Sequence, residues 1–186
     1  KHGEEGIRLA SAGGLLEVSD DTQMSLFTLE GQLRAAQDGV PMTEPLIDAI
    51  RHAYLDWHRT QSGRWNARDR SQAIGLVRHA VLWQRQAPGN TCLSALGAGG
   101  LGSVEKPIND SKGCGGVMRT APLGFLGEKT SEKDVYAHGV AAAALTHGHP
   151  DGWAPAGVMA LAVRGLLGGA AWIDVVAAGL STVQAH

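Results

Sequence analysis

The sequence has few cysteines, no excess of charge of either sign and no long uncharged apolar run, and each absence narrows the possible functions. The two cysteines, Cys92 and Cys114, do not form a Cys-x-x-Cys pair, which argues against a disulfide framework or a zinc knuckle and favours a reducing compartment. The 16 basic and 18 acidic side chains give a formal net charge of −2, too small to attract bulk nucleic acid or an anionic membrane. No segment resembles a signal peptide or a membrane span, so we expect a cytoplasmic protein.

Sustained alternation of apolar and polar residues is also missing, and this absence argues against β-strands. The 186 residues are 44% hydrophobic and 18% charged, which is typical of one globular domain with a core. The chain starts at Lys1 without a methionine and stops at His186 directly after an apolar helical pattern. We therefore expect residues 1–186 to form a single all-α domain that is incomplete at both ends.

Apolar residues recur at helical spacing along most of the chain. In the first such segment Leu26, Leu29 and Leu33 form one row and Met24 and Phe27 form a second, which predicts a buried helix. The segments expected to be helical are residues 22–36, 47–57, 74–81, a short stretch after Asn90, residues 131–145, a stretch that begins near Trp153, and residues 172–183. Pro45 lies near the start of the second of these helices, and Ser131 is expected to cap the fifth. The helix that begins near Trp153 contains the small residue Gly157, where we expect a close contact with another helix. Residues 61–71, and residues 97–116 with seven glycines and one proline, are expected to be irregular.

Two adjacent carboxylates and two hydroxyl groups stand at the start of the first expected helix, in Ser19, Asp20, Asp21 and Thr22. Asp and Ser are favoured there as caps, because they accept hydrogen bonds from free N–H groups and suit the positive end of the helix dipole. The same oxygens suit Mg²⁺, which often uses one or two carboxylates plus water. A cap needs only one carboxylate, and two neighbouring carboxylates repel each other unless a cation or solvent relieves them. The turn therefore predicts either a helix cap or a metal site, and the second acid favours the metal.

Residues 109–119 read Asn-Asp-Ser-Lys-Gly-Cys-Gly-Gly-Val-Met-Arg and place three glycines, a hydroxyl and a lysine before an apolar stretch. Glycine permits positive φ and close approach, so successive N–H groups can point at one anion, and a following helix N-terminus would add a favourable dipole. The segment matches neither the P-loop nor the dinucleotide-binding fingerprint. It predicts either an anion-binding loop or a tight turn between closely packed helices. Cys114 is expected to be a small packed residue rather than a nucleophile.

Two histidines, His147 and His149, follow an alanine-rich helical segment. Their spacing, without a cysteine or a third histidine nearby, argues against zinc. A histidine at a helix end often bonds to the last carbonyl groups of the helix. The functional alternative is a neutral imidazole that hydrogen-bonds a ligand.

Three motifs occur in a fixed order: Ser-Asp-Asp-Thr at residues 19–22, the glycine-rich segment at residues 109–119, and Leu-Thr-His-Gly-His-Pro at residues 145–150. Together they resemble the ADP-ribosylglycohydrolase family, which includes the dinitrogenase reductase-activating glycohydrolase, from about Val18 to the C-terminus. The resemblance implies a compact orthogonal helical bundle. It also implies a metal centre, usually of two Mg²⁺ or Mn²⁺ ions, that holds a ribose next to the bond to be cleaved.

The resemblance also implies roles for individual residues. Ser19, Asp20 and Asp21 would bind metal, and both aspartates would be catalytic. The residues implied to bind ADP-ribose, around its diphosphate and distal ribose, are Asn109, Ser111, Lys112, Gly113, Cys114, Gly115, Gly116, Met118 and His147. The implied partner is ADP-ribose or an ADP-ribosylated substrate, cleaved at the glycosidic bond to a protein side chain or another acceptor.

The sequence departs from the family pattern in two places. It lacks the N-terminal Gly-Asp-Ala-Leu-Gly stretch with its downstream glutamate, and it lacks the C-terminal Asp-x-Asp-Thr cluster that supplies ligands to both metals. The sequence ends at His186, before the C-terminal cluster would be reached, so we expect truncation or disorder rather than divergence to explain its absence. Two alternatives stay open: a module that binds ADP-ribose without cleaving it, and a structural helical protein like the crystallin-like relatives of the family.

Overall fold

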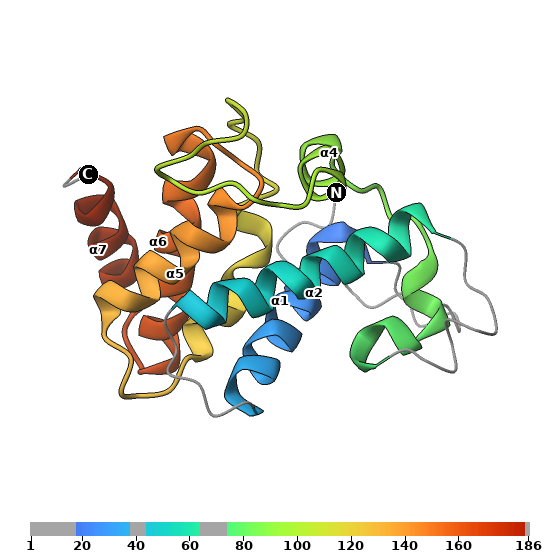
Figure 1. Ribbon diagram of the computed structural model, residues 1–186. Helices are drawn as coiled ribbons and strands as arrows, with labels where there is room; N and C mark the ends of the chain where they lie inside the picture. The colour runs from blue at the N-terminus through green and yellow to red at the C-terminus, as the bar shows by residue number, and fades with distance from the viewer. Residues whose placement is uncertain (1–17, 38–43, 64–73, 185–186) are drawn as a thin grey trace, which may run out of the picture.

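The computed structural model describes residues 18–37, 44–63 and 74–184, and every regular element in these ranges is a helix (Figure 1). The α-helices are α1 (Asp20–Gln37), α2 (Glu44–Ser62), α4 (Asn90–Gly97), α5 (Glu132–Ala144), α6 (Pro150–Leu167) and α7 (Trp172–Gln184). Short 3₁₀ helices lie between them, namely η1 (Gly75–Arg78), η2 (Ala80–Trp83), η3 (Val117–Arg119) and η4 (Ala121–Phe125). The predicted all-α fold is confirmed.

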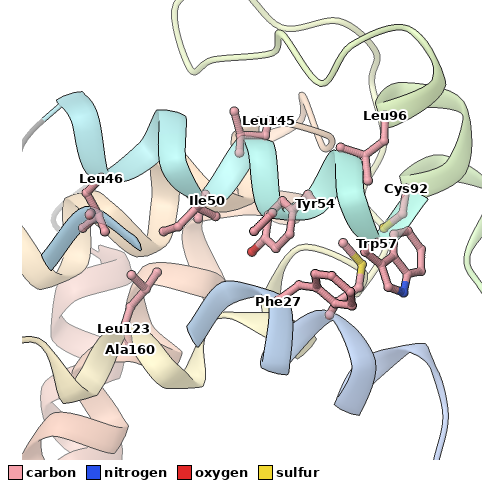
Figure 2. Packing of buried hydrophobic residues seen from close by; sticks show 14 of the residues in the cluster. Phe27, Leu46, Ile50, Tyr54, Trp57, Cys92, Leu96, Leu123, Leu145 and Ala160 are labelled. Atoms are coloured by element: carbon pink, nitrogen blue, oxygen red, sulfur yellow. The ribbon is translucent and has the colours of Figure 1, made fainter. Parts of the chain in front are cut away.

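The core is built on one side of α2. Leu46, Ile50, Tyr54 and Trp57 follow one another along this helix at spacings of three or four residues, and all four side chains are fully buried (Figure 2). They pack against α1, whose Phe27 lies in the same cluster. The helix predicted over residues 47–57 is confirmed, and it begins three residues earlier than the pattern indicated.

Glycines allow the main helix pairs to approach closely. A Cβ added at Gly31 of α1 would lie 2.6 Å from the Cα of Ile50 in α2. A Cβ added at Gly139 of α5 would lie 2.7 Å from the Cα of Gly157 in α6. Real Cβ atoms do not come so close, so these crossings require glycine. The predicted role of Gly157 at a close helix contact is confirmed.

The prediction that the leucine row of the first helix is buried is wrong. Met24 and Phe27 are fully buried, whereas Leu26 is exposed and Leu33 is 55% exposed. The reason is that α2 covers the side of α1 that carries Met24 and Phe27. Helical spacing revealed two apolar rows but not which of them a neighbouring helix would cover.

The prediction of a single helix over residues 74–81 is also wrong. The segment forms two 3₁₀ helices, η1 and η2, on either side of His79, which has extended backbone angles. Gly75 has a φ of +72°, in the left-handed region that an α-helix excludes. Val77 is buried, but Ile74 is 79% exposed and Val81 is also exposed, so the apolar spacing does not describe one buried face.

The remaining helices begin close to their predicted positions. Ser131 caps α5, since its Oγ accepts a hydrogen bond of 3.2 Å from the Asp134 N–H. His149 caps α6, and this helix begins at Pro150 rather than near Trp153. The short helix after residue 90 and the last helix from residue 172 are confirmed as α4 and α7. Most of the loop predicted over residues 61–71 lies outside the described residues.

Within the described residues, no helix combines the length and the apolar character that crossing a membrane requires.

Candidate functional site

Segments far apart in the sequence meet around the first turn of α4. Asp20, the first residue of α1, accepts a hydrogen bond of 3.0 Å from the N–H of Gly89, which immediately precedes α4. Two residues later, the hydroxyl of Thr91 lies 3.2 Å from the hydroxyl of Ser111. Ser111 begins the segment 111–116, which we call the glycine loop. The first turn of α4 therefore joins the start of α1 to the glycine loop.

The start of α1 carries Ser19, Asp20 and Asp21, which we call the acidic turn. Ser19 Oγ donates a hydrogen bond of 2.6 Å to Asp21 Oδ2, and both residues are exposed, whereas Asp20 is buried. Burial raises the pKa of Asp20 above its ordinary value, and the neighbouring Asp21 raises it further, while the hydrogen bond from the Gly89 N–H opposes this change. Neither aspartate forms an ion pair with any described residue. Among the described residues, the turn therefore holds two adjacent carboxylates without a compensating cationic side chain.

The donor set of the acidic turn fits one hard cation. Two carboxylates and a hydroxyl, completed by water, are a sufficient set of oxygen ligands for Mg²⁺. In the described part of the chain, no group of three or more His, Cys, Asp or Glu residues gathers where it could hold a metal ion. Ser19, Asp20 and Asp21 therefore fit one ion, and they provide too few charged ligands for the two ions that the resemblance implies. Both aspartates also lie in the first turn of α1, where the helix dipole favours acids, so capping remains compatible with the geometry.

The glycine loop is held in place by the side chain of Asn109. The Asn109 amide nitrogen donates to the carbonyl oxygen of Thr146 at 2.8 Å. Its amide oxygen accepts from the N–H groups of Ser111 and Gly148, both at 3.0 Å. Asn109 thus fastens the start of the loop to the end of α5. Its predicted contact with a ligand stays a prediction, because the structure shows this amide binding protein groups.

The glycines of the loop allow close approach. A Cβ at Gly115 would lie 2.8 Å from Cys92 Sγ and 2.9 Å from His147 Cε1, and a Cβ at Gly116 would lie 2.5 Å from the carbonyl oxygen of Gly152. Of the two properties that glycine permits, positive φ is not used in this loop, since the described glycines with positive φ all lie elsewhere. These glycines are needed because neighbouring segments occupy the space of a side chain.

The segment after the loop is the three-residue helix η3. No α-helix begins directly after the loop, so the expected contribution of a helix dipole to anion binding is wrong. Met118 in η3 donates its N–H to the carbonyl oxygen of Cys114 at 3.1 Å, and its own carbonyl accepts from Ser25 Oγ of α1 at 3.2 Å. Met118 thereby ties the end of the loop to α1.

Two loop side chains point outward. Cys114 is exposed, so the expectation that it is a packed residue is wrong, and Cys92 of α4 is the cysteine that packs in the core. Lys112 is also exposed, with its Nζ 3.3 Å from Asp151 Oδ2. The lysine charge therefore stands at the outer side of the loop, where a dissolved anion can reach it.

His147 lies beneath the loop at the end of α5 and is only 1% exposed. Its Nδ1 lies 2.8 Å from Thr146 Oγ1, and its Nε2 faces the loop, because a Cβ at Gly113 would lie 3.4 Å from that atom. Among the described residues, Nε2 has no hydrogen-bond partner. Burial, with a smaller contribution from the charge of Arg119, lowers the pKa of His147 to about 4. His147 is therefore a neutral imidazole with one nitrogen directed at the glycine loop.

Sequence patterns alone assign no role to Arg119, which the structure places behind His147. Its guanidinium group is fully buried, donates to Thr146 Oγ1 at 2.7 Å and to the carbonyl oxygen of Ala142 at 2.9 Å, and lies 4.2 Å from the ring centroid of Tyr54. The signal present in the sequence is its isolated charge in the otherwise uncharged run from residue 117 to 127. Thr91, which contacts the loop from α4, gives no comparable signal.

Comparison with known proteins agrees with the order of the three motifs. The family model described as ADP-ribosylglycohydrolase matches residues 2–186, which include all three of them. Neither the curated proteins nor the solved structures contain a match to this chain. The family is one of helical hydrolases that act on ADP-ribose linkages, and an all-helical chain matched over almost its entire length belongs to the ADP-ribosylglycohydrolase family.

Proposed function

We propose that the chain forms the substrate-binding part of a metal-dependent hydrolase, which cleaves the glycosidic bond between ADP-ribose and a protein side chain or another acceptor. The supporting observation is that the first turn of α4 holds the acidic turn beside the glycine loop. Binding and chemistry would be divided between them. The loop would hold the diphosphate, and the acidic turn would act on the ribose that carries the bond to be cleaved.

The glycine loop suits a diphosphate for three reasons. Its backbone is accessible because Gly113 carries no side chain and is exposed. Lys112 provides a positive charge at its outer side, and His147 directs at it the Nε2 atom, which bonds no described residue. Backbone N–H groups, a lysine and an imidazole are groups that commonly bind phosphate oxygens. The predicted ligand contacts of Ser111, Gly115, Gly116 and Cys114 follow from their place in the same loop.

The acidic turn suits the reacting end of the substrate. Mg²⁺ or Mn²⁺ held by Ser19, Asp20 and Asp21 would supply Lewis-acid stabilisation and lower the pKa of a water molecule. Cleavage at an anomeric carbon develops positive, oxocarbenium-like charge. The carboxylates of Asp20 and Asp21 carry the negative charge that stabilises such a centre, which is the catalytic role proposed for them.

A binding module that does not hydrolyse ADP-ribose is the second candidate. The observation that favours it is the donor count, since the acidic turn offers carboxylates for one ion only among the described residues. We therefore expect weak turnover, or none, by the 186-residue chain alone. Release of ADP-ribose from a panel of ADP-ribosylated substrates measures this directly. The same assay on a full-length chain separates the two candidates: tight binding without turnover on any substrate would favour the binding module, and robust turnover would favour the hydrolase.

Calorimetry on the 186-residue chain tests the two halves of the site separately. The decisive variant replaces Asp20 and Asp21 by asparagine, which removes both charges but keeps an oxygen that can accept from the Gly89 N–H. We expect it to lose Mg²⁺ and Mn²⁺ binding and to keep ADP-ribose binding. Asp174→Asn is the matched control, because this exposed acid lies alone in the first turn of α7.

Two outcomes of the same titrations would contradict the proposal. Unchanged metal affinity in the double variant would leave Asp20 and Asp21 as helix caps. Failure of the parent chain to bind either ADP-ribose or metal would favour a structural helical protein, in which caps and turns alone account for the motifs.

A further inference from the structure

The buried end of α5 carries a chain of hydrogen bonds behind the glycine loop. The Arg119 guanidinium donates to Thr146 Oγ1 at 2.7 Å, and Thr146 Oγ1 lies 2.8 Å from His147 Nδ1. Arg119 and Thr146 are fully buried, and His147 is almost so. This series of hydrogen bonds ends at His147 Nε2, which faces Gly113 and Gly115 and has no hydrogen-bond partner among the described residues. A fixed series of groups therefore leads from the core to the underside of the loop.

The direction of these hydrogen bonds follows from the chemistry of the groups. A guanidinium only donates, so Thr146 Oγ1 accepts from Arg119. The hydroxyl proton of Thr146 can then go to His147 Nδ1 at 2.8 Å, to the carbonyl oxygen of Ala143 at 3.4 Å, or to the Cys92 side chain, whose sulfur is a weak acceptor. That carbonyl already accepts the N–H groups of Thr146 and His147, at 3.1 and 3.0 Å. The shorter, less crowded bond to Nδ1 is favoured, which makes Nδ1 an acceptor.

The charge of Arg119 also favours the tautomer in which Nδ1 is an acceptor. No carboxylate among the described residues pairs with this guanidinium, which is instead held by Thr146, by the Ala142 carbonyl and by the face of the Tyr54 ring. In the neutral imidazole, a proton on Nδ1 would turn the positive end of an N–H dipole towards the Arg119 charge, which no described carboxylate neutralises. The imidazole therefore keeps its single proton on Nε2, the nitrogen that faces the loop.

We propose that Arg119 is a positioning residue that acts through Thr146 and holds His147 as a neutral Nε2–H donor for an anionic oxygen bound in the glycine loop. Nε2 faces Gly113 and Gly115 and bonds no described residue, so its N–H is available to an acceptor that a ligand supplies. The identity of the anion, a phosphate of ADP-ribose, rests on the proposed function. The tautomer of His147 is a property of the protein without any ligand.

The tautomer is tested in the free protein by nitrogen-15 NMR of labelled histidine, with the His147 signals assigned by their loss in His147→Asn. Thr146→Val removes the hydroxyl at nearly constant shape, and Thr146→Ser is the matched control that keeps it. We expect the parent and Thr146→Ser to show the Nε2–H tautomer at neutral pH. We expect Thr146→Val to lose this single tautomer. A parent in the Nδ1–H form, or an unchanged Nε2–H form in Thr146→Val, would overturn the proposal.

Binding is tested by calorimetry with ADP-ribose and with inorganic pyrophosphate. Loss of one hydrogen bond of ordinary strength corresponds to about a tenfold loss of affinity, which we expect for Thr146→Val, whereas Thr146→Ser should bind like the parent. Thermal unfolding of both variants shows whether they are folded. Unchanged affinity in a folded Thr146→Val whose tautomer has changed would contradict the donor role of Nε2.

The two proposals can fail separately. If the parent binds neither ADP-ribose nor pyrophosphate, the proposed function fails, yet the NMR measurement still decides whether Arg119 and Thr146 set the tautomer of His147. Arg119→Lys provides a second variant, because lysine keeps a donor and a charge but loses the planar guanidinium, whose Nη2 bonds both Thr146 and Ala142 and whose carbon lies over the Tyr54 ring. We expect it to weaken the preference for the Nε2–H tautomer, and an unchanged tautomer population in folded Arg119→Lys would contradict the role assigned to Arg119.

Discussion

The acidic turn and the glycine loop lie on either side of the first turn of α4, but they are built differently. The loop is fastened at its start by Asn109 and at its end by Met118, and Cys92 and His147 pack against its middle. The acidic turn is held at Asp20, whose carboxylate accepts from the Gly89 N–H and whose own N–H donates to the Gln86 carbonyl oxygen at 2.9 Å, but the other two residues of the turn are exposed. The loop is therefore shaped by the protein in advance of any ligand, whereas the acidic turn keeps oxygens available for a group that is added later.

This contrast predicts that substitutions in the two regions fail in different ways. A change in the loop should lower stability and ligand affinity together, because the same contacts hold the loop and shape its surface. A change in the acidic turn should alter metal binding and leave the fold intact. The largest effect is expected in the loop and the smallest in the acidic turn.

Gly115→Val should give the largest loss of stability. Its first added carbon would overlap Cys92 Sγ and His147 Cε1, at 2.8 and 2.9 Å, and both neighbours are buried. Overpacking of this kind costs about 1–3 kcal/mol, which for a chain of this size lowers Tm by roughly 5 °C. Thermal unfolding measures the loss. Calorimetry should show weaker ADP-ribose binding and unchanged Mg²⁺ binding.

Two other glycines act as controls for this variant. Gly127→Ala should leave Tm and binding unchanged, because no atom lies within 4 Å of the added Cβ. Gly113→Ala should leave Tm nearly unchanged, since its Cβ meets His147 Nε2 at an ordinary distance of 3.4 Å, but it should weaken ADP-ribose binding by filling space in front of that nitrogen. A Gly115→Val protein with the stability and the ADP-ribose affinity of the parent would show that the loop is not shaped by these contacts.

Parts of the fold could be predicted from the sequence because they depend on local patterns. The buried side of α2 follows from apolar spacing, and the start of α5 follows from the capping preference of Ser131. The exposed leucine row of α1, with Leu33 its most exposed member, could not be predicted, because burial there depends on where α2 lies. The prediction of a helix after Gly75 was wrong for a related reason. The conformation of this segment depends on contact with Glu30 of α1, whose Oε1 accepts the Leu76 N–H at 3.1 Å.

The same distinction between local patterns and long-range contacts applies to the candidate site. The order of the motifs along the chain points to the acidic turn, the glycine loop and His147 as candidate site residues, and their roles stay predictions. Thr91 and Arg119 were missed because their importance comes from contacts across 20 and 27 residues of sequence, to Ser111 and Thr146. A single sequence contains no information on such pairs, whereas a motif shared by a family contains residues already selected together.

Acid should affect the two regions in opposite directions. The pKa of His147 is lowered from 6.5 to about 4 in the folded protein, so the unfolded chain takes up a proton first as the pH falls. The stability contributed by neutral His147 is thus complete above about pH 6.5 and is lost as the pH falls through about 4. For Asp20 the folded pKa is raised, so acid favours the folded state instead.

The measurement is Tm against pH, in the absence of metal, for the parent and for His147→Asn. We expect a decline in the parent below about pH 6.5 and a smaller slope between 6.5 and 4 in the variant. The slopes are compared rather than the Tm values, because losing a buried ring also lowers stability on its own. Equal slopes in the two proteins would contradict the neutral, buried state assigned to His147.

The smallest expected change in Tm is that of Asp20→Asn. This variant is also the sharpest test of the acidic turn. Because the pKa of Asp20 is raised on folding, its ionised form at neutral pH destabilises the folded state relative to the neutral form. Asparagine is neutral and keeps an oxygen for the Gly89 N–H. Without metal, the variant should therefore unfold at a Tm equal to or slightly above that of the parent.

Added Mg²⁺ should reverse the order of the two proteins, because an ion that binds only the folded state stabilises it, and only the parent keeps both carboxylates. The pair of unfolding curves, with chelator and with saturating Mg²⁺, thus separates a metal site from a helix cap. A cap would give the opposite pattern. If the charge of Asp20 served only to stabilise the start of α1, Asp20→Asn would lower Tm in chelator, and Mg²⁺ would move neither protein. Reversal of the order by Mg²⁺ would instead show that an added cation stabilises the acidic turn, as expected for the adjacent carboxylates of Asp20 and Asp21, which pair with no cationic side chain of the described residues.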